Sequence, residues 1–220
     1  MLGVYVSVPI ACFRKGLARE YLETELLPPP ATCYGFLLSL VGETDRRRHV
    51  GCRVTASRLT HPDISVVLRT VWRVKKMPLG SPGNTRPDYQ QLLTDIRLVV
   101  WLDSREEKQE GAKLEARVKR AIEDPGTIDR FGGLSLGEST HLVDEVSVFD
   151  EKSPEGRLGS LERSRFDTFL VHPRGRLTLP VWVDHVGSAG TRYATGNLEP
   201  TPDFVAPVVD RLPQISPEIS

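Results

Sequence analysis

The chain has 220 residues, 29 Lys and Arg against 29 Asp and Glu, and a hydrophobic fraction of 39 %. This composition excludes a wholly disordered chain, and the absence of any run of about 18 apolar residues excludes a transmembrane helix. The first apolar segment precedes its basic residues, unlike a secretory signal, so we expect a cytoplasmic protein of one domain or two small ones.

Charge is distributed unevenly along the chain. Residues 1–90 carry 13 Lys and Arg and 7 Asp and Glu, whereas residues 91–220 carry 16 and 22. A basic first part suits a polyanion such as nucleic acid, and an acidic second part suits a basic protein partner or plain solubility. Charge runs are also typical of solvated faces, so charge alone leaves these alternatives open.

The first predicted elements are a strand and a helix. Residues 3–9 alternate β-branched, aromatic and small side chains, which predicts a strand. Residues 31–41 are apolar almost all round and predict a buried helix, with Pro30 in its first turn and Gly42 as its C-terminal cap.

A cation-rich segment lies between this strand and this helix. Phe13, Arg14 and Lys15 are followed by Arg19 and Tyr21. An aromatic ring beside cations suits base stacking combined with phosphate contacts in a nucleic-acid site. The alternative is an ordinary loop with one buried phenylalanine.

Strands and a long excursion follow the helix. Residues 46–49 (RRRH) predict a basic loop, and residues 50–60 and 64–76 predict an antiparallel hairpin that turns at Pro62. The stretch 77–89 is rich in Pro, Gly and Asn. It predicts either a projecting, hairpin-like finger or a disordered surface loop.

A glycine-rich turn is the main feature of the second half. Residues 131–139 (FGGLSLGES) permit close approach of a phosphate or another chain, or simply form a tight connection. The other predicted elements are a strand at 92–103, an amphipathic helix at 104–123, a strand at 141–149, a polar linker at 150–164, a hairpin of 165–172 and 176–185, and an extended tail.

The order of these elements predicts an α+β fold. Residues 1–150 follow the order β-α-β-β-(β)-α-β, which is typical of a ferredoxin-like, RRM-like βαββαβ domain. Residues 151–220 are expected to form a small β-rich C-terminal region, with a hairpin and an extended segment.

No constellation of catalytic or metal-binding residues is recognisable. The five histidines form no dyad and no His-x-x-x-His spacing, and most lone histidines are hydrogen-bonding residues. Cys12, Cys33 and Cys52 lack the spacing of a zinc site or a disulfide framework, so we expect buried, reduced thiols. We therefore expect no cofactor, no metal and no enzymatic activity.

Three segments together resemble the Cas-five family of CRISPR-associated proteins, within the RAMP superfamily. They are VYVSVPIACFRKG at the start, PPPATCYGFLLSLVGE in the predicted helix, and GGLSLGEST in the glycine-rich turn. The resemblance covers roughly residues 1–149 and is most specific in the helix motif from Pro30 to Gly42. The C-terminal third offers little to match.

This resemblance implies a non-catalytic subunit of a type I Cascade surveillance complex, with a type I-B-like system favoured. Such a subunit binds and caps the 5′ handle of the CRISPR guide RNA. It contacts the backbone subunit and the large subunit, close to the target DNA in RNA-guided DNA targeting, and it has no membrane partner. The resemblance also implies a protruding β-hairpin thumb, inserted around residues 76–90 of this chain, that lies against the RNA near the first backbone subunit. The predicted RNA-binding residues are Phe13, Arg14, Lys15, Arg19, Arg46, Arg47, Arg48, Lys75, Lys76, Arg86, Gly133 and Gly137.

Two alternatives belong to other functional classes. A type I-C-like branch of the family is a metal-independent endoribonuclease that processes precursor CRISPR RNA with a Tyr and an adjacent Lys-His pair. This chain has no Lys-His pair, and Arg48-His49 is the nearest equivalent, with Tyr34 or Tyr89 as the candidate tyrosine. The other alternative is an assembly protein whose basic patches contact protein instead of RNA.

Overall fold

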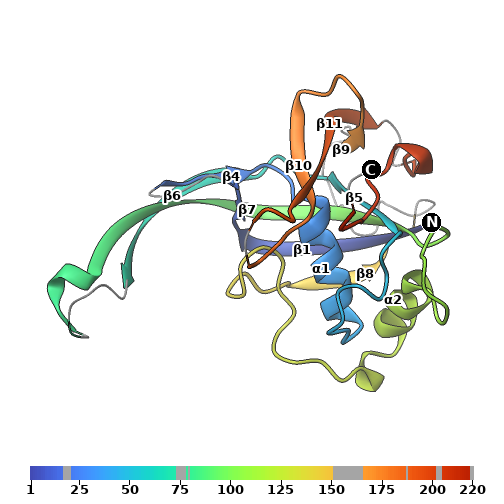
Figure 1. The fold of residues 1–220 in the computed structure, drawn as a ribbon, viewed down its shortest axis with the longest axis horizontal. Helices are drawn as coiled ribbons and strands as arrows, with labels where there is room; N and C mark the ends of the chain where they lie inside the picture. Colours follow the sequence, from blue (N-terminus) through green and yellow to red (C-terminus); the bar gives the residue numbers. More distant parts are fainter. Residues whose placement is uncertain are drawn as a thin grey trace.

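A nine-stranded, mostly antiparallel sheet organises the chain (Figure 1). This computed structural model describes residues 1–16, 21–72, 78, 80–150, 166–186, 188–201 and 205–218. At one end of the sheet the strand order is β5-β7-β1-β8, with β8 at the edge, and each neighbouring pair is antiparallel. These strands are β1 (Leu2–Ala11), β5 (Arg53–Arg58), β7 (Thr85–Asp103) and β8 (Glu145–Val148). The expected α+β class is therefore confirmed.

Helix α1 (Pro30–Leu40) connects β1 to β5 and lies against the sheet, in contact with β5. Its side chains are buried on most sides because its sequence is apolar almost all round. At its end the amide of Glu43 donates to the carbonyl of Leu38 and that of Gly42 to Ser39, with Gly42 at φ +66°. This is the glycine-capped end that the sequence predicts.

Helix α2 (Leu114–Glu123) connects β7 to β8 and packs against both α1 and β8. The expectation of a helix from residue 104 onward is wrong for its first ten residues, which are irregular. The carboxylate of Glu107 is buried and accepts the backbone N–H of Leu114, so it occupies the start of the helix. Its burial holds residues 104–113 outside the helical path.

The expected hairpin between residues 50–60 and 64–76 is also wrong. β6 (Asp63–Trp72) pairs with the first half of β7, whereas β5 pairs with the second half. The chain does not reverse at Pro62, because Thr60 binds the backbone of β7 at Asp95 and Arg97. β6 therefore continues in the direction of β5.

We call the paired strands β6 and residues 85–94 of β7 the arm. The arm projects far from the rest of the sheet (Figure 1). A 3-10 turn, η1 (Pro82–Asn84), leads into β7, so the last part of the predicted excursion, residues 85–89, is strand. Residues 73–77 and 79 lie outside the described part of the chain.

The C-terminal strands extend the same sheet. They are β9 (Phe166–Val171), β10 (Leu177–Trp182) and β11 (Arg192–Thr201), and β9 pairs with β5. The predicted hairpin of 165–172 and 176–185 is wrong, because β11 lies between β9 and β10. The connection crosses β11 where Gly175 meets Gly196, and a Cβ on either glycine would collide with backbone atoms. The division into domains at residue 150 stays a prediction, and residues 151–164 of the predicted linker lie outside the described residues.

Apolar side chains are buried on both faces of the sheet. Val4, Val6 and Val8 face the helices, while Trp101 on the opposite face meets Phe149 edge to face with ring centroids 5.8 Å apart. Leu212 covers this second face. The three cysteines are buried and unbridged, as expected. Within the described residues, no helix is both long and apolar enough to span a membrane.

Candidate nucleic-acid interface

The segment after β1 folds back on itself at the root of the arm, which we define as residues 63–69 of β6 and 88–94 of β7. β2 (Phe13–Arg14) pairs with β4 (Thr24–Glu25), and β3 (Tyr21–Leu22) runs parallel to β7 with Tyr21 opposite Tyr89. The amide of Thr24 donates to Gln91 of β7 at 3.0 Å. The segment is therefore attached to the arm.

The predicted cations of this segment have different surroundings. Arg14 is exposed, and Lys15 Nζ lies 3.9 Å from Glu23 Oε1. Phe13 is only 2 % exposed and belongs to the core, so the expected base-stacking role is wrong in this structure and the alternative of a buried phenylalanine holds. Arg19 lies outside the described residues.

The glycine-rich turn is attached to the end of β1. Gly137 has φ +102°, and a Cβ there would lie 2.9 Å from the carbonyl oxygen of Cys12. Nδ1 of His141 accepts the backbone N–H groups of Cys12 and Glu138, both at 3.2 Å. Burial lowers the pKa of His141, although Glu138 opposes that shift. The close approach that Gly137 permits is therefore to the chain's own backbone, whereas Gly133 is exposed with only Leu142 near its open side.

Glu138 also joins the turn to the arm. One of its carboxylate oxygens accepts from Nε2 of Gln90 at 2.9 Å, and the other lies 3.3 Å from Nη1 of Arg69. Arg69 in turn donates to Gln90. The glycine-rich turn, β1 and the root of the arm therefore form one connected unit.

A hollow of about 380 Å³ opens between α1, the glycine-rich turn and the end of β10. Small residues form much of its wall, and Arg46 and His185 supply polar groups. The lining residues are Ala31, Thr32, Gly35, Phe36, Ser39, Arg46, Ser135, Gly137, Val183 and His185. The structure thus brings together Arg46 and Gly137, two predicted residues that are far apart in sequence.

Arg46 is held firmly in place. Its guanidinium lies 3.9 Å from the centre of the Trp182 ring, and Nη2 donates to the carbonyl of Val183 at 2.6 Å. The Tyr34 hydroxyl donates to the backbone carbonyl of Arg46 at 2.8 Å, and burial raises the pKa of Tyr34 far above its usual range.

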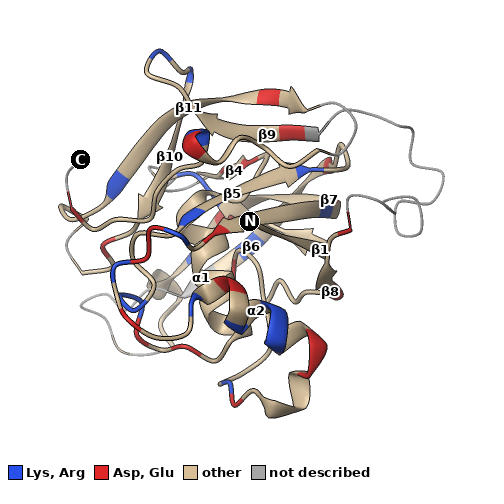
Figure 2. Ribbon diagram, turned by 90° about the vertical axis from the view of Figure 1, so that its right-hand side faces the viewer, with Lys and Arg blue, Asp and Glu red and all other residues tan. Residues whose placement is uncertain are grey.

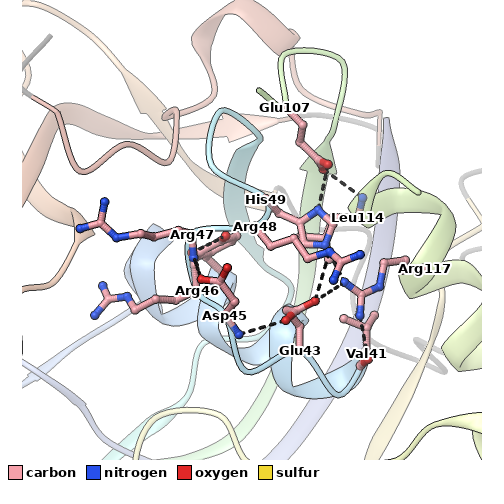
Figure 3. Close-up of polar contacts among 11 residues, drawn as sticks. Val41, Glu43, Asp45, Arg46, Arg47, Arg48, His49, Glu107, Leu114 and Arg117 are labelled. Atoms are coloured by element: carbon pink, nitrogen blue, oxygen red, sulfur yellow. Dashed lines mark hydrogen bonds and ion pairs between the residues drawn. The ribbon is translucent and has the colours of Figure 1, made fainter. Parts of the chain in front are cut away.

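Arg47 and Arg48 are exposed and belong to a turn whose backbone is fixed from within. The amide of Arg47 donates to Oδ1 of Asp45 at 2.8 Å, and the amide of Asp45 donates to Oε1 of Glu43 at 3.0 Å. In Figure 3 the side chains of Arg46 and Arg47 point away from Glu43. Nε of Arg48 lies 3.5 Å from Oε2 of Glu43.

A buried polar chain lies behind this turn (Figure 3). Nδ1 of His49 is 2.9 Å from Glu107 Oε2, and Nε2 is 2.8 Å from Nη1 of Arg117. Because a guanidinium only donates, Nε2 accepts and Nδ1 carries the proton. Nη1 of Arg117 also donates to Glu43 at 2.6 Å. Both nitrogens of His49 are thus engaged inside the protein.

Glu43 and Glu107, the two glutamates of this buried polar chain, are charged. Burial alone would raise the pKa of Glu107, but hydrogen bonds from His49, Ser104 and the amide of Leu114 outweigh it and lower the pKa. The pKa of Glu43 is likewise lowered, since Arg117 outweighs the effect of burial. Sequence reasoning missed Glu43, Glu107 and Arg117, which only the fold brings together.

The remaining predicted residues belong to the arm. Nε of Arg86 is 2.8 Å from Oδ1 of Asp88, while Lys75 and Lys76 lie outside the described residues. One face of the arm root exposes the apolar side chains of Ile64, Val66, Leu68, Tyr89 and Tyr21. In the described part of the chain, no group of His, Cys, Asp and Glu could hold a metal ion.

The charge asymmetry of the sequence is partly neutralised by ion pairs within the fold. Basic residues of the first half pair with acidic residues of the second half, and Figure 2 shows both signs side by side around the helices. The ion pairs that join the two halves of the sequence include Arg53–Glu106, Arg58–Asp167 and Arg69–Glu138. Among the described residues of the first half, these arginines are therefore paired with carboxylates and do not add to one continuous basic face.

Comparison with known proteins assigns the family. No family model matches the chain. A CRISPR-associated protein Cas5 from Myxococcus xanthus (strain DK1622) is 57 % identical over 217 residues, which cover 98 % of this chain and 97 % of that protein. A structure described as a CRISPR RNA-guided surveillance complex shares the fold at 15 % identity and a TM-score of 0.60, covering 91 % of this chain and 90 % of that chain. A crystal structure of a Cas protein is also 15 % identical, with a TM-score of 0.52 and 99 % of both chains covered. As its motifs predict, the chain belongs to the Cas5 family of CRISPR-associated proteins.

Proposed function

We propose that this chain is a non-catalytic subunit of a type I Cascade complex that binds and caps the 5′ handle of the CRISPR guide RNA. The hollow beside α1 carries this proposal, because it joins Arg46, the small residues of the helix motif and the glycine-rich turn. Small side chains such as Thr32 and Gly35 allow a sugar-phosphate backbone to approach closely, and Arg46 supplies positive charge.

The strand order supports a ferredoxin-like core. The order β5-β7-β1-β8, with α1 and α2 in the two crossovers, matches the βαββαβ arrangement used by many RNA-binding modules. The similarity in fold to a chain of an RNA-guided surveillance complex agrees with this assignment.

The arm is our candidate for the thumb. It spans β6 and the first half of β7 and is therefore larger than the expected insertion around residues 76–90. Arg14 and Lys15 lie on the segment attached to its root, so guide RNA in the hollow would pass near both. We further propose that the arm faces the backbone subunit, with the large subunit and the target DNA close by.

A binding role fits this site better than ribonuclease catalysis. General acid–base cleavage of RNA requires a side chain that can exchange a proton with the ribose 2′-hydroxyl. The ring of His49 is buried between Glu107 and Arg117, and the hydroxyl of Tyr34 is bonded to a backbone carbonyl. These contacts support the non-catalytic proposal.

Incubation with labelled repeat RNA in EDTA, resolved on native and denaturing gels, tests the proposal. We expect intact RNA that shifts only when the repeat-derived 5′ handle is present. A discrete cleavage product that disappears in His49→Ala would overturn the non-catalytic role. Intact RNA that never shifts, alone or with the other subunits, would favour a purely assembling protein.

A further inference from the structure

The polar chain behind the basic turn has a role that the RNA-binding proposal does not itself contain. Glu43 is the nearest carboxylate to two cations, Arg117 and Arg48. We infer that Arg117 is a positioning residue that neutralises Glu43 and so leaves Arg48 available to an RNA phosphate. This inference rests on the proposed RNA-binding function.

The geometry distinguishes the two cations sharply. Nη1 of Arg117 lies 2.6 Å from Oε2 of Glu43, within strong hydrogen-bond range, whereas Nε of Arg48 lies 3.5 Å from the same oxygen. The side chain of Arg48 is 52 % exposed and that of Arg117 is 23 % exposed. Arg48 is therefore the cation that can leave.

Arg117 is kept at Glu43 by contacts on its other sides. Its Nη1 also donates to Nε2 of His49, and its Nη2 donates to the carbonyl of Val41 at 3.3 Å. Glu107 orients His49 by accepting from Nδ1. The chain Glu107–His49–Arg117 thus fixes a guanidinium beside Glu43 whether or not Arg48 is present.

The consequence for Arg48 follows from the cost of burying an unpaired charge. Glu43 has a side-chain exposure of only 9 %, so losing its last cation would be unfavourable. With Arg117 in place, Glu43 stays paired when Arg48 turns outward to a phosphate. Without Arg117, Glu43 would retain Arg48 and remove one phosphate contact from the RNA surface.

Binding of a fluorescent single-stranded RNA with a repeat-derived 5′ handle, measured over a range of salt concentrations, tests this idea on the full chain. Arg48→Gln should lower the affinity about tenfold and reduce the slope of log K against log salt by about 0.7, the loss of one phosphate contact. Arg117→Gln should reproduce most of both changes. The double variant Glu43→Gln with Arg117→Gln should recover the wild-type slope, because no carboxylate then competes for Arg48.

Glu43→Gln alone provides a test that does not depend on Arg117→Gln folding. If Arg117 already neutralises Glu43, this variant should keep the wild-type slope. A slope steeper by about 0.7 would mean that Glu43 restrains Arg48 in the native protein, and would overturn the inference. Arg120→Gln, an exposed position one turn along α2, is the matched control and should bind like wild type.

The outcomes separate the two proposals. Wild-type binding by Arg48→Gln would remove the basic turn from the RNA surface and so contradict the underlying function at this site. Weak binding by Arg48→Gln with wild-type binding by Arg117→Gln would overturn the positioning role alone. Equal weakness of Arg117→Gln and the double variant would also overturn it, since Arg117 would then act independently of Glu43.

Discussion

The two halves of β7 lie in contrasting environments. Residues 98–102 (LVVWL) are essentially all buried, because helices and C-terminal segments cover both faces of the sheet there. Residues 85–94 form the arm, where buried Gln90 lies beside exposed Tyr89. One continuous strand therefore serves first as an exposed arm and then as the centre of a core. The arm therefore depends on the rest of the sheet, here called the body, into which β7 continues, since isolated two-stranded ribbons are only marginally stable.

The largest expected effect tests this contrast directly. Leu98 in the body half is fully buried, so Leu98→Ala should lower the free energy of unfolding by about 2–5 kcal/mol. Leu68 in the arm is 63 % exposed, and Leu68→Ala should change it by less than about 0.5 kcal/mol. Chemical denaturation of both variants measures the difference, and equal losses would contradict the contrast.

A second prediction concerns the joint between body and arm. Gly137→Ala combines a left-handed backbone with a Cβ 2.9 Å from the carbonyl of Cys12 and should cost about 1–3 kcal/mol. Gly132 also has a positive φ, of +76°, but nothing lies within 4 Å of its Cβ position. Gly132→Ala should therefore be less destabilising than Gly137→Ala. Thermal unfolding of both variants measures the difference. Equal destabilisation would show that the close approach to the carbonyl of Cys12 is unimportant.

The third prediction uses pH to weaken the same joint. The folded-state pKa of His141 is lowered, chiefly by burial, so the unfolded chain takes up its proton first as pH falls below about 6.5. Stability from the neutral ring is therefore present above that pH and declines as pH falls from 6.5 toward the lowered value. Unfolding measured between pH 7.5 and 5 should show this decline, and His141→Gln should flatten it. An unchanged slope in the variant would assign the decline to other groups.

The smallest expected effect on stability lies at the exposed root of the arm. Arg14→Ala should leave the free energy of unfolding within about 0.5 kcal/mol of wild type, because the side chain is exposed. The same change should weaken binding of handle RNA and reduce its salt dependence, since a phosphate contact is lost. Unchanged affinity in the gel-shift assay would count against Arg14 as an RNA contact.

The contrast within β7 also explains which sequence expectations were wrong. The run at 98–102 predicts a strand unambiguously, whereas the Pro and Gly residues at 78–83 suggest an excursion that ends near residue 90. The strand instead begins at Thr85, since the pairing with β6 supplies its hydrogen bonds. Likewise, the hairpins expected at Pro62 and near Gly175 do not form, because β6 and β10 each pair with the strand that follows them, whereas β5 and β9 pair with strands farther along the chain.

The sequence by itself determined the family, the α+β class, strand β1 and helix α1 with its proline entry and glycine cap. These features depend on local pattern: alternation, an apolar run, and residues with special backbone preferences. Only the tertiary structure decided that Phe13 is buried, that Gly137 meets Cys12, and that His49 lies between Glu107 and Arg117. Contacts between residues far apart in the chain leave no periodic signal in a single sequence, so the fold must form before such neighbours can be identified.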